Sequence, residues 1–170
     1  MAHGPRQRAQ YRRRRTGETD YSRRLKLLRN GSPRAVVRIS NTQTTAQLVI
    51  FKPDGDQVVV GATGEGLVKK YGWPEKMSRK SIPASYLVGY TLGKAAVSAG
   101  HSDAVLDIGL SSSAPGARVF SALKGMVDAG MAIPHGESVI PPQERIDGAH
   151  IDAKVAKAVD KTKSKIEGAF

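Results

Sequence analysis

The stretch PRAVVRISNTQTTAQLVIFKPDGDQVVVGAT, residues 33–63, contains three segments rich in valine, isoleucine and threonine, separated by two polar connections. These side chains favour extended backbone, so strands are predicted over residues 33–40, 45–51 and 57–63. The Asp-Gly pair at 54–55 is a strong signal for a tight hairpin. The stretch therefore predicts three antiparallel strands joined in order as a meander.

The first of these strands carries two basic side chains, Arg34 and Arg38, at positions of the same parity. Successive side chains on a strand point to opposite faces, so these two are expected to project from one face of the sheet. Val36 shares their parity, and the face is therefore expected to be partly covered rather than purely polar.

Beyond residue 63, helical and strand patterns alternate along the chain. Helices are predicted over 81–100, 117–130 and 151–167, and a short buried strand over 103–110. Two connections are predicted to be less regular: 64–81, a helical turn followed by a basic loop, and 139–150, an arm. The order predicts the α/β class, a mixed sheet begun by the antiparallel meander with helices packed against it.

The N-terminal segment has two parts. Residues 1–19 are polar, basic and almost free of aliphatic side chains, so they are predicted to be disordered until they bind a partner. Asp20 is a predicted N-cap for a helix over residues 21–29. This helix has an apolar stripe that is expected to dock on the body: Tyr21, Leu25 and Leu28. Its basic side chains are expected to face elsewhere: Arg23, Arg24, Lys26 and Arg29.

The formal net charge is +12, and it is unevenly distributed. Residues 1–30 carry a net charge of +8, and arginine outnumbers lysine there by nine to one. The planar guanidinium group pairs with phosphate oxygens through two hydrogen bonds and stacks on bases. A polyanion partner is therefore predicted, with RNA favoured over anionic lipid because the segment lacks the apolar face of an interfacial helix. A solubilising tail, a membrane-surface segment and a nuclear-targeting signal are the alternatives.

Several functional classes are excluded or disfavoured by composition and motif. The chain has no cysteine, which excludes disulfides, thiolate zinc sites and cysteine nucleophiles. It has no run of about 18 apolar residues that could span a membrane, and its basic start is not followed by the apolar segment of a signal peptide. It has no phosphate-binding loop, no dinucleotide fingerprint and no histidine spacing typical of a metal site. No cofactor, metal or small-molecule substrate is therefore expected.

Two carboxylates are the best candidates for catalysis. Asp103 and Asp107 flank the predicted buried strand, and paired carboxylates can hold a metal or share a proton. The simpler interpretation is that Asp103 is a turn residue and that Asp107 caps an element or pairs with Arg118. We expect that the protein is not an enzyme, and an RNA-processing hydrolase remains the alternative.

The remaining signals favour RNA. Aromatic residues make up only 5% of the chain, too few for a base-stacking sheet. Dense arginine with sparse aromatics is typical of proteins that recognise the shape and backbone of RNA. We therefore expect three units: a basic RNA-threading tail (1–19), an α/β RNA-binding domain (20–135), and an extended arm with a C-terminal helix (136–170).

The sequence also resembles a known family. The blocks YRRRRTGETDYSRRLKLL, RAVVRISN, AQLVIF, LDIGL, GARVFSALKGMVDAGMAIPHGE and PPQERIDGAHI occur in the order expected of the universal large-subunit ribosomal protein L-eighteen family. The chain is similar to the archaeal branch, whose eukaryotic relative is the longer L-five protein. The similarity covers about residues 4–151.

The resemblance implies a structural role. It implies binding to 5S ribosomal RNA (rRNA) in the central protuberance of the large subunit of cytoplasmic ribosomes. Large-subunit rRNA and neighbouring ribosomal proteins would be further partners. It also implies a ribonuclease-H-like arrangement of the sheet, without catalysis.

The expected RNA-binding residues come from charge and from the resemblance. Those supported by charge are Arg6, Arg8, Arg12, Arg13, Arg14, Arg15, Arg23, Arg24, Lys26, Arg29, Arg34, Arg38, Lys76, Arg79 and Lys80. Three more rest on the resemblance alone: Ser40, Asn41 and Gln47.

Overall fold

The β-branched segments form the sheet that their pattern predicts. In the computed structural model, which describes Gly4 and residues 7–170, the meander consists of β1 (Arg34–Ile39), β2 (Thr44–Ile50) and β3 (Gln57–Thr63). Both pairings are antiparallel, and a bulge interrupts the β2–β3 register. A fourth strand, β4 (Val105–Asp107), joins β1 in parallel and gives the order β3-β2-β1-β4. The predicted strand over 103–110 is thus confirmed only in its centre.

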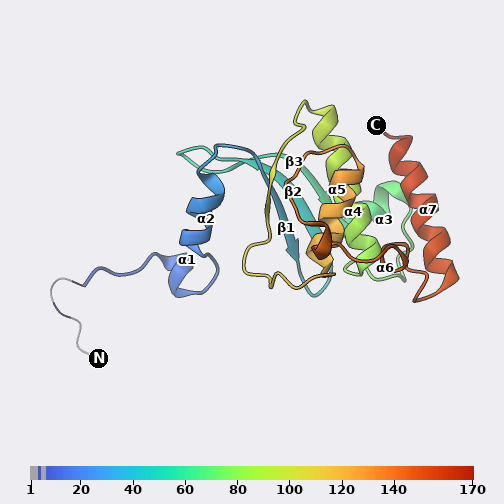
Figure 1. Ribbon diagram of the computed structural model, residues 1–170, viewed down its shortest axis with the longest axis horizontal. Helices are drawn as coiled ribbons and strands as arrows, with labels where there is room; N and C mark the ends of the chain where they lie inside the picture. The colour runs from blue at the N-terminus through green and yellow to red at the C-terminus, as the bar shows by residue number, and fades with distance from the viewer. Residues whose placement is uncertain (1–3, 5–6) are drawn as a thin grey trace.

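One face of the sheet builds the core. Ala35 and Val37 on β1 are fully buried, as are Ala46 and Leu48 on β2, because alternate side chains point to the same side. Two helices pack on the sheet, α4 (Ile82–Ser98) on β2 and β3 and α5 (Arg118–Asp128) on β1 (Figure 1). The α/β class and both predicted helices are confirmed.

The two core helices approach each other closely because glycines lie at their contact. A methyl group on Gly89 of α4 would collide with the backbone of Ala122, and one on Gly125 of α5 would collide with the backbone of Tyr86. Glycine lacks this carbon and lets the backbones meet. No helix in the described part of the chain is long and apolar enough to cross a bilayer.

Shorter elements complete the body. These are α3 (Gly64–Tyr71), the 3-10 helix η1 (Glu137–Val139), α6 (Gln143–Asp147) and α7 (Ala153–Glu167). The arm over 139–150 was predicted to be irregular, but it contains α6, whose Ile146 is buried. The last helix is confirmed, although it begins at Ala153 instead of residue 151, and Ile151 before it is exposed.

The N-terminal segment contains two short helices. Arg12–Arg15 form a single helical turn, α1, within the segment 1–19, and the ordering of this segment by a partner stays a prediction. The next helix, α2 (Tyr21–Leu28), begins where predicted, because the Asp20 carboxylate accepts a hydrogen bond from the amide of Arg23 at 3.1 Å. These two helices lie at one end of the molecule, and α7 lies at the other (Figure 1).

Candidate nucleic-acid interface

The outer face of the sheet, opposite α4 and α5, is only partly covered. In the β1–β2 register Val36 lies beside Gln47, and Arg38 lies beside Thr45, so these side chains share that face. The Arg38 side chain is 48% exposed, and the other three residues are half-buried. The face therefore offers a cationic group and an amide to a ligand.

Asp107 connects the two arginines of this face. Arg34 Nη1 donates to Asp107 Oδ2 at 2.7 Å, and Arg38 Nη2 donates to Asp107 Oδ1 at 3.0 Å. The amide of Gly109 also donates to Asp107 Oδ1, at 2.9 Å. The prediction that Arg34 and Arg38 project from one face is confirmed. The expected pairing of Asp107 with Arg118 is wrong, because β4 lies directly beside β1.

The surroundings of Asp107 stabilise its charged form. Burial alone would raise its pKa, but the charge of Arg38, the Gly109 amide and the hydrogen bonds from Arg38 and Arg34 outweigh burial. The pKa of Asp107 therefore lies below its ordinary value, and the carboxylate stays ionised. It neutralises charge that the outer face would otherwise carry.

A second carboxylate, Asp56, fixes α2 to the body. Arg24 Nη2 donates to both oxygens of Asp56, at 2.7 and 2.8 Å, and Arg34 Nη2 donates to Oδ2 at 2.5 Å. At the preceding position of α2, Arg23 donates to the backbone carbonyl of Gly109. Two of the basic side chains expected to face away from the body, Arg23 and Arg24, are thus the ones that attach the helix to it.

The apolar contacts of α2 also differ from the prediction. Leu25 is 68% exposed, whereas Tyr21, Leu27 and Leu28 are half-buried. The predicted stripe therefore holds at its two ends but not at Leu25. Arg24 is turned toward Asp56, and the next side chain along the helix, Leu25, points to solvent.

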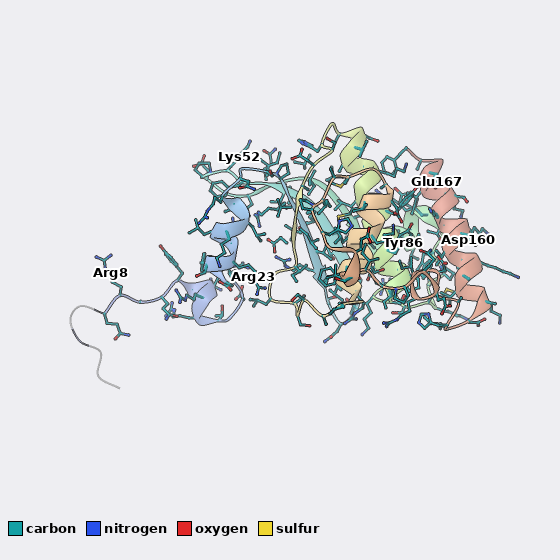
Figure 2. All side chains as sticks on the ribbon, in the orientation of Figure 1. Arg8, Arg23, Lys52, Tyr86, Asp160 and Glu167 are labelled. Atoms are coloured by element: carbon teal, nitrogen blue, oxygen red, sulfur yellow. The ribbon has the colours of Figure 1, made fainter. Side chains whose placement is uncertain are left out.

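The turn before α2 folds back on it. Arg13 Nε donates to Thr19 Oγ1 at 2.8 Å, and Arg13 Nη1 lies 3.6 Å from Glu18 Oε2. The rings of Tyr11 and Tyr21 are in contact, with centroids 5.2 Å apart. Together these residues close one side of a cleft of about 460 Å³ between α2 and the sheet. Figure 2 shows Arg23 at this site.

The cleft itself is nearly neutral, because its cations and anions are matched. Five arginines and four carboxylates line it: Arg13, Arg23, Arg24, Arg34, Arg38, Glu18, Asp20, Asp56 and Asp107. Arg34 is only 2% exposed and is paired with two carboxylates. Its burial does not fit the expected role as a surface contact to phosphate.

Most of the predicted RNA-binding cations that are exposed lie outside the cleft. Among the predicted residues that the structure describes, those that are exposed, lie outside the cleft and have no carboxylate within 4 Å are Arg8, Arg12, Arg14, Arg15, Lys26, Arg29 and Lys76. All but Lys76 belong to residues 7–29, which we call the head. Arg6 lies outside the described residues. The head thus divides into arginines that hold it in place and cations that face solvent.

A second basic segment adjoins the β1–β2 turn. The amide of Thr44 donates to the carbonyl of Arg79 at 3.0 Å, which brings the loop carrying Lys76, Arg79 and Lys80 beside the turn. Arg79 and Lys80 are half-buried there. Within the turn, Ser40 Oγ accepts from the amide of Gln43 at 3.0 Å, so Ser40 shapes the backbone. Asn41 is exposed at the tip.

The two candidate catalytic carboxylates do not form a pair. Asp103 is exposed and Asp107 is buried, and four residues of extended chain separate them by about 13 Å. Among the described residues no group of three potential metal ligands occurs. Sequence reasoning missed Asp56, which it treated as part of a turn. An acid in a basic chain, placed directly before the predicted third strand, was the available signal.

Comparison with known proteins gives a consistent result. The family model described as ribosomal large subunit proteins 60S L5 and 50S L18 matches residues 5–103 and 98–136. The chain is 48% identical over 151 residues to the large ribosomal subunit protein uL18 of Methanoculleus marisnigri, covering 89% of this chain and 85% of that protein. It is 47% identical over 151 residues to the uL18 of Natronomonas pharaonis, covering 89% of this chain and 80% of the relative. It is also 47% identical over 153 residues to the uL18 of Haloquadratum walsbyi, covering 90% of this chain and 73% of that protein.

Proposed function

Because this chain belongs to the family of the large-subunit ribosomal proteins L5 and L18, we propose that its head binds 5S rRNA. As a member of that family it is a structural constituent of the large ribosomal subunit and not an enzyme. The alternative of an RNA-processing hydrolase is not retained, because Asp103 and Asp107 do not converge.

The proposal rests on the two kinds of basic side chain in the head, those that bond within the protein and those that stay exposed. Arg23 and Arg24 are used within the protein, on Gly109 and Asp56, and they fix α2 on the sheet. The cations that remain exposed are Arg8, Arg12, Arg14, Arg15, Lys26 and Arg29. A row of like charges that the protein itself does not neutralise is stabilised when phosphates neutralise it.

We assign the outer sheet face to the same interface. Arg38 and Gln47 lie on that face, and the β1–β2 turn with the Lys76 loop continues it at one end. These groups offer hydrogen bonds and charge but few aromatic surfaces, which favours contacts to the RNA backbone over base stacking. The head and this face together present a surface for a folded RNA.

The wider placement of the protein is part of the same proposal. We propose that the protein helps to attach the bound 5S rRNA to large-subunit rRNA in the central protuberance, beside other ribosomal proteins. Large-subunit rRNA would contact cations that the 5S complex leaves exposed.

Filter binding tests the proposal. Purified protein is titrated against 5S rRNA and against an unrelated RNA duplex over a series of salt concentrations. We expect tighter binding to 5S rRNA and an affinity that falls steeply with salt, because each phosphate contact releases condensed cations. A flat response to salt, or equal binding of the two RNAs, would contradict it.

A further inference from the structure

The C-terminal helix α7 carries a charge pattern that the head does not explain. The helix lies at the end of the molecule opposite α2 (Figure 1), beyond the residues that the family model matches. Its buried face consists of Val159, Thr162 and Ile166 and packs beside α3 and α4. This packing fixes which side chains of α7 face solvent.

Lysines form one row on the exposed side of α7. The row, which we call the lysine stripe, consists of Lys154, Lys157, Lys161 and Lys165, all exposed. At 3.6 residues per turn they fall within a sector of about 80°. At 1.5 Å per residue the row is about 16 Å long. The stripe is therefore narrow, straight and long enough to follow several phosphates.

The acidic side chains of α7 lie outside this row. Glu167 accepts a hydrogen bond from the Tyr90 hydroxyl at 2.8 Å. Helical geometry places Asp160 about 60° beyond the edge of the row; Figure 2 labels both acids on α7. The remaining lysine, Lys163, lies over the rings of Tyr86 and Tyr90, 5.9 and 5.3 Å from their centroids. Cations and anions are thus segregated around the helix.

The stripe is not neutralised by the protein. Among the described residues no carboxylate lies within 4 Å of any of its four ammonium groups. Lysines four apart on a helix repel each other, as Lys157, Lys161 and Lys165 do here. Two lysines elsewhere in the described chain are paired at the same spacing, the exposed Lys69 with Glu65 and the half-buried Lys124 with Asp128. The unpaired row therefore favours an external anion.

We propose that the lysine stripe binds the phosphate backbone of a second RNA segment, distinct from the segment held by the head. This inference rests on the proposed function, which supplies RNA as the surrounding polyanion. A lipid surface fits less well, because the apolar face that would enter a bilayer is already buried against the body. Since the two surfaces lie at opposite ends, one chain can bridge two RNA segments.

A two-step capture experiment tests the bridge. Immobilised 5S rRNA is saturated with the full-length protein, excess protein is washed away, and a fluorescent RNA duplex of unrelated sequence is titrated on. The informative variant is K157Q/K161Q, because both side chains are exposed and outside the buried face. Lys165 is kept, because its ammonium group lies against Gly72 at the end of α3. The control is K52Q/R118Q, which removes the same charge from two exposed side chains that lie outside α7 and have no ion pair in the described chain.

The expected result is that the wild type and the control retain the duplex. The K157Q/K161Q variant should lose at least about fivefold in duplex affinity, and the slope of log K against log salt should fall by about 2. Binding of the first RNA should not change. Circular dichroism and thermal melting of both variants check that α7 remains folded.

Three results would overturn the inference: no duplex retained by the wild type, equal retention by K157Q/K161Q, or an equal loss in the control. A loss of 5S binding in K157Q/K161Q would also overturn it, because the stripe would then belong to the first interface. Failure of wild-type protein to bind 5S rRNA counts against the proposed function instead. In that case, the same duplex titration on protein immobilised through its N-terminus tests the stripe by itself.

Discussion

Arg34 and Asp107 form a buried ion pair between neighbouring strands, with Arg34 Nη1 2.7 Å from Asp107 Oδ2 and both side chains less than 10% exposed. The same guanidinium reaches Asp56, which in turn holds Arg24 of α2. A chain of charges therefore runs from β4 through β1 to the helix that carries the head. Stability of the sheet and placement of the head depend on the same side chains.

Replacing Asp107 should destabilise the fold strongly. Asp107→Asn removes the negative charge opposite Arg34 and leaves a buried guanidinium with one carboxylate instead of two. We expect a loss of about 3–5 kcal/mol in the free energy of unfolding, measured by urea denaturation. Asp103→Asn is the matched control, since Asp103 is exposed, and it should change stability by less than about 0.5 kcal/mol. Equal effects of the two would contradict the ion-pair interpretation.

Asp56→Asn should loosen α2. The variant loses the double contact to Arg24, while Arg34 keeps Asp107 as a partner, so we expect a cost of about 1–2 kcal/mol. Amide hydrogen exchange should rise in α2 and affinity for 5S rRNA should fall, because the head is no longer held on the sheet. Asp54→Asn, an exposed acid in the same loop without an ion pair in the described chain, should leave both measurements unchanged.

Acid should weaken the fold through these two carboxylates. The pKa values of Asp56 and Asp107 lie below 3.8 in the folded protein, so their contribution to stability is complete above that pH. It is lost as the pH falls from 3.8 through the lowered pKa values. Unfolding free energies measured from pH 7 to acid should show this decrease. A flatter curve is expected for Asp107→Asn, and an unchanged curve in that variant would show that other groups cause the decrease.

The helical turn α1 should contribute charge rather than stability. Replacing Arg12, Arg13, Arg14 and Arg15 by alanine removes three exposed guanidinium groups and one, Arg13, that is partly used on Glu18. We expect a loss of several kcal/mol in 5S rRNA binding and a decrease of about 2–3 in the salt slope. The melting temperature should hardly change. A salt slope equal to that of the wild type would show that the turn stays solvated in the complex.

Substitutions of Arg34 and Arg38 should differ in their effects on stability and on RNA binding. Arg38→Lys keeps the charge at a partly exposed site but loses the planar fork and hydrogen bonds to Asp107, so RNA binding should weaken, with a smaller loss of stability than Arg34→Lys causes. Arg34→Lys should lower stability, because the ammonium group cannot reach two buried carboxylates at once. Any loss of binding in Arg34→Lys should follow from undocking of α2. A binding loss with normal stability and a docked helix would mean that Arg34 itself reaches the RNA.

Local patterns in the sequence were sufficient for most of the fold. The β-branched segments and the Asp-Gly turn predicted the meander, because strand propensity and turn geometry depend on neighbouring residues. The start of α2 followed from Asp20 for the same reason, since an N-cap acts over three residues. The helix over 117–130 followed from the helical spacing of four apolar residues, of which Val119, Leu123 and Met126 are buried and Val127 is half-buried.

What the sequence alone determined is therefore the set of strands and helices, the resemblance to a family, and the concentration of positive charge in the first 30 residues. Only the tertiary structure decided which of those charges are free. The pairs Arg24–Asp56 and Arg34–Asp107 join residues 32 and 73 positions apart, and no local pattern encodes such contacts. Charge can be counted along a chain, but its availability depends on which carboxylates the fold places within a few ångströms. Burial removes Arg34 from any surface, while Arg12 and Arg14 stay exposed for a partner.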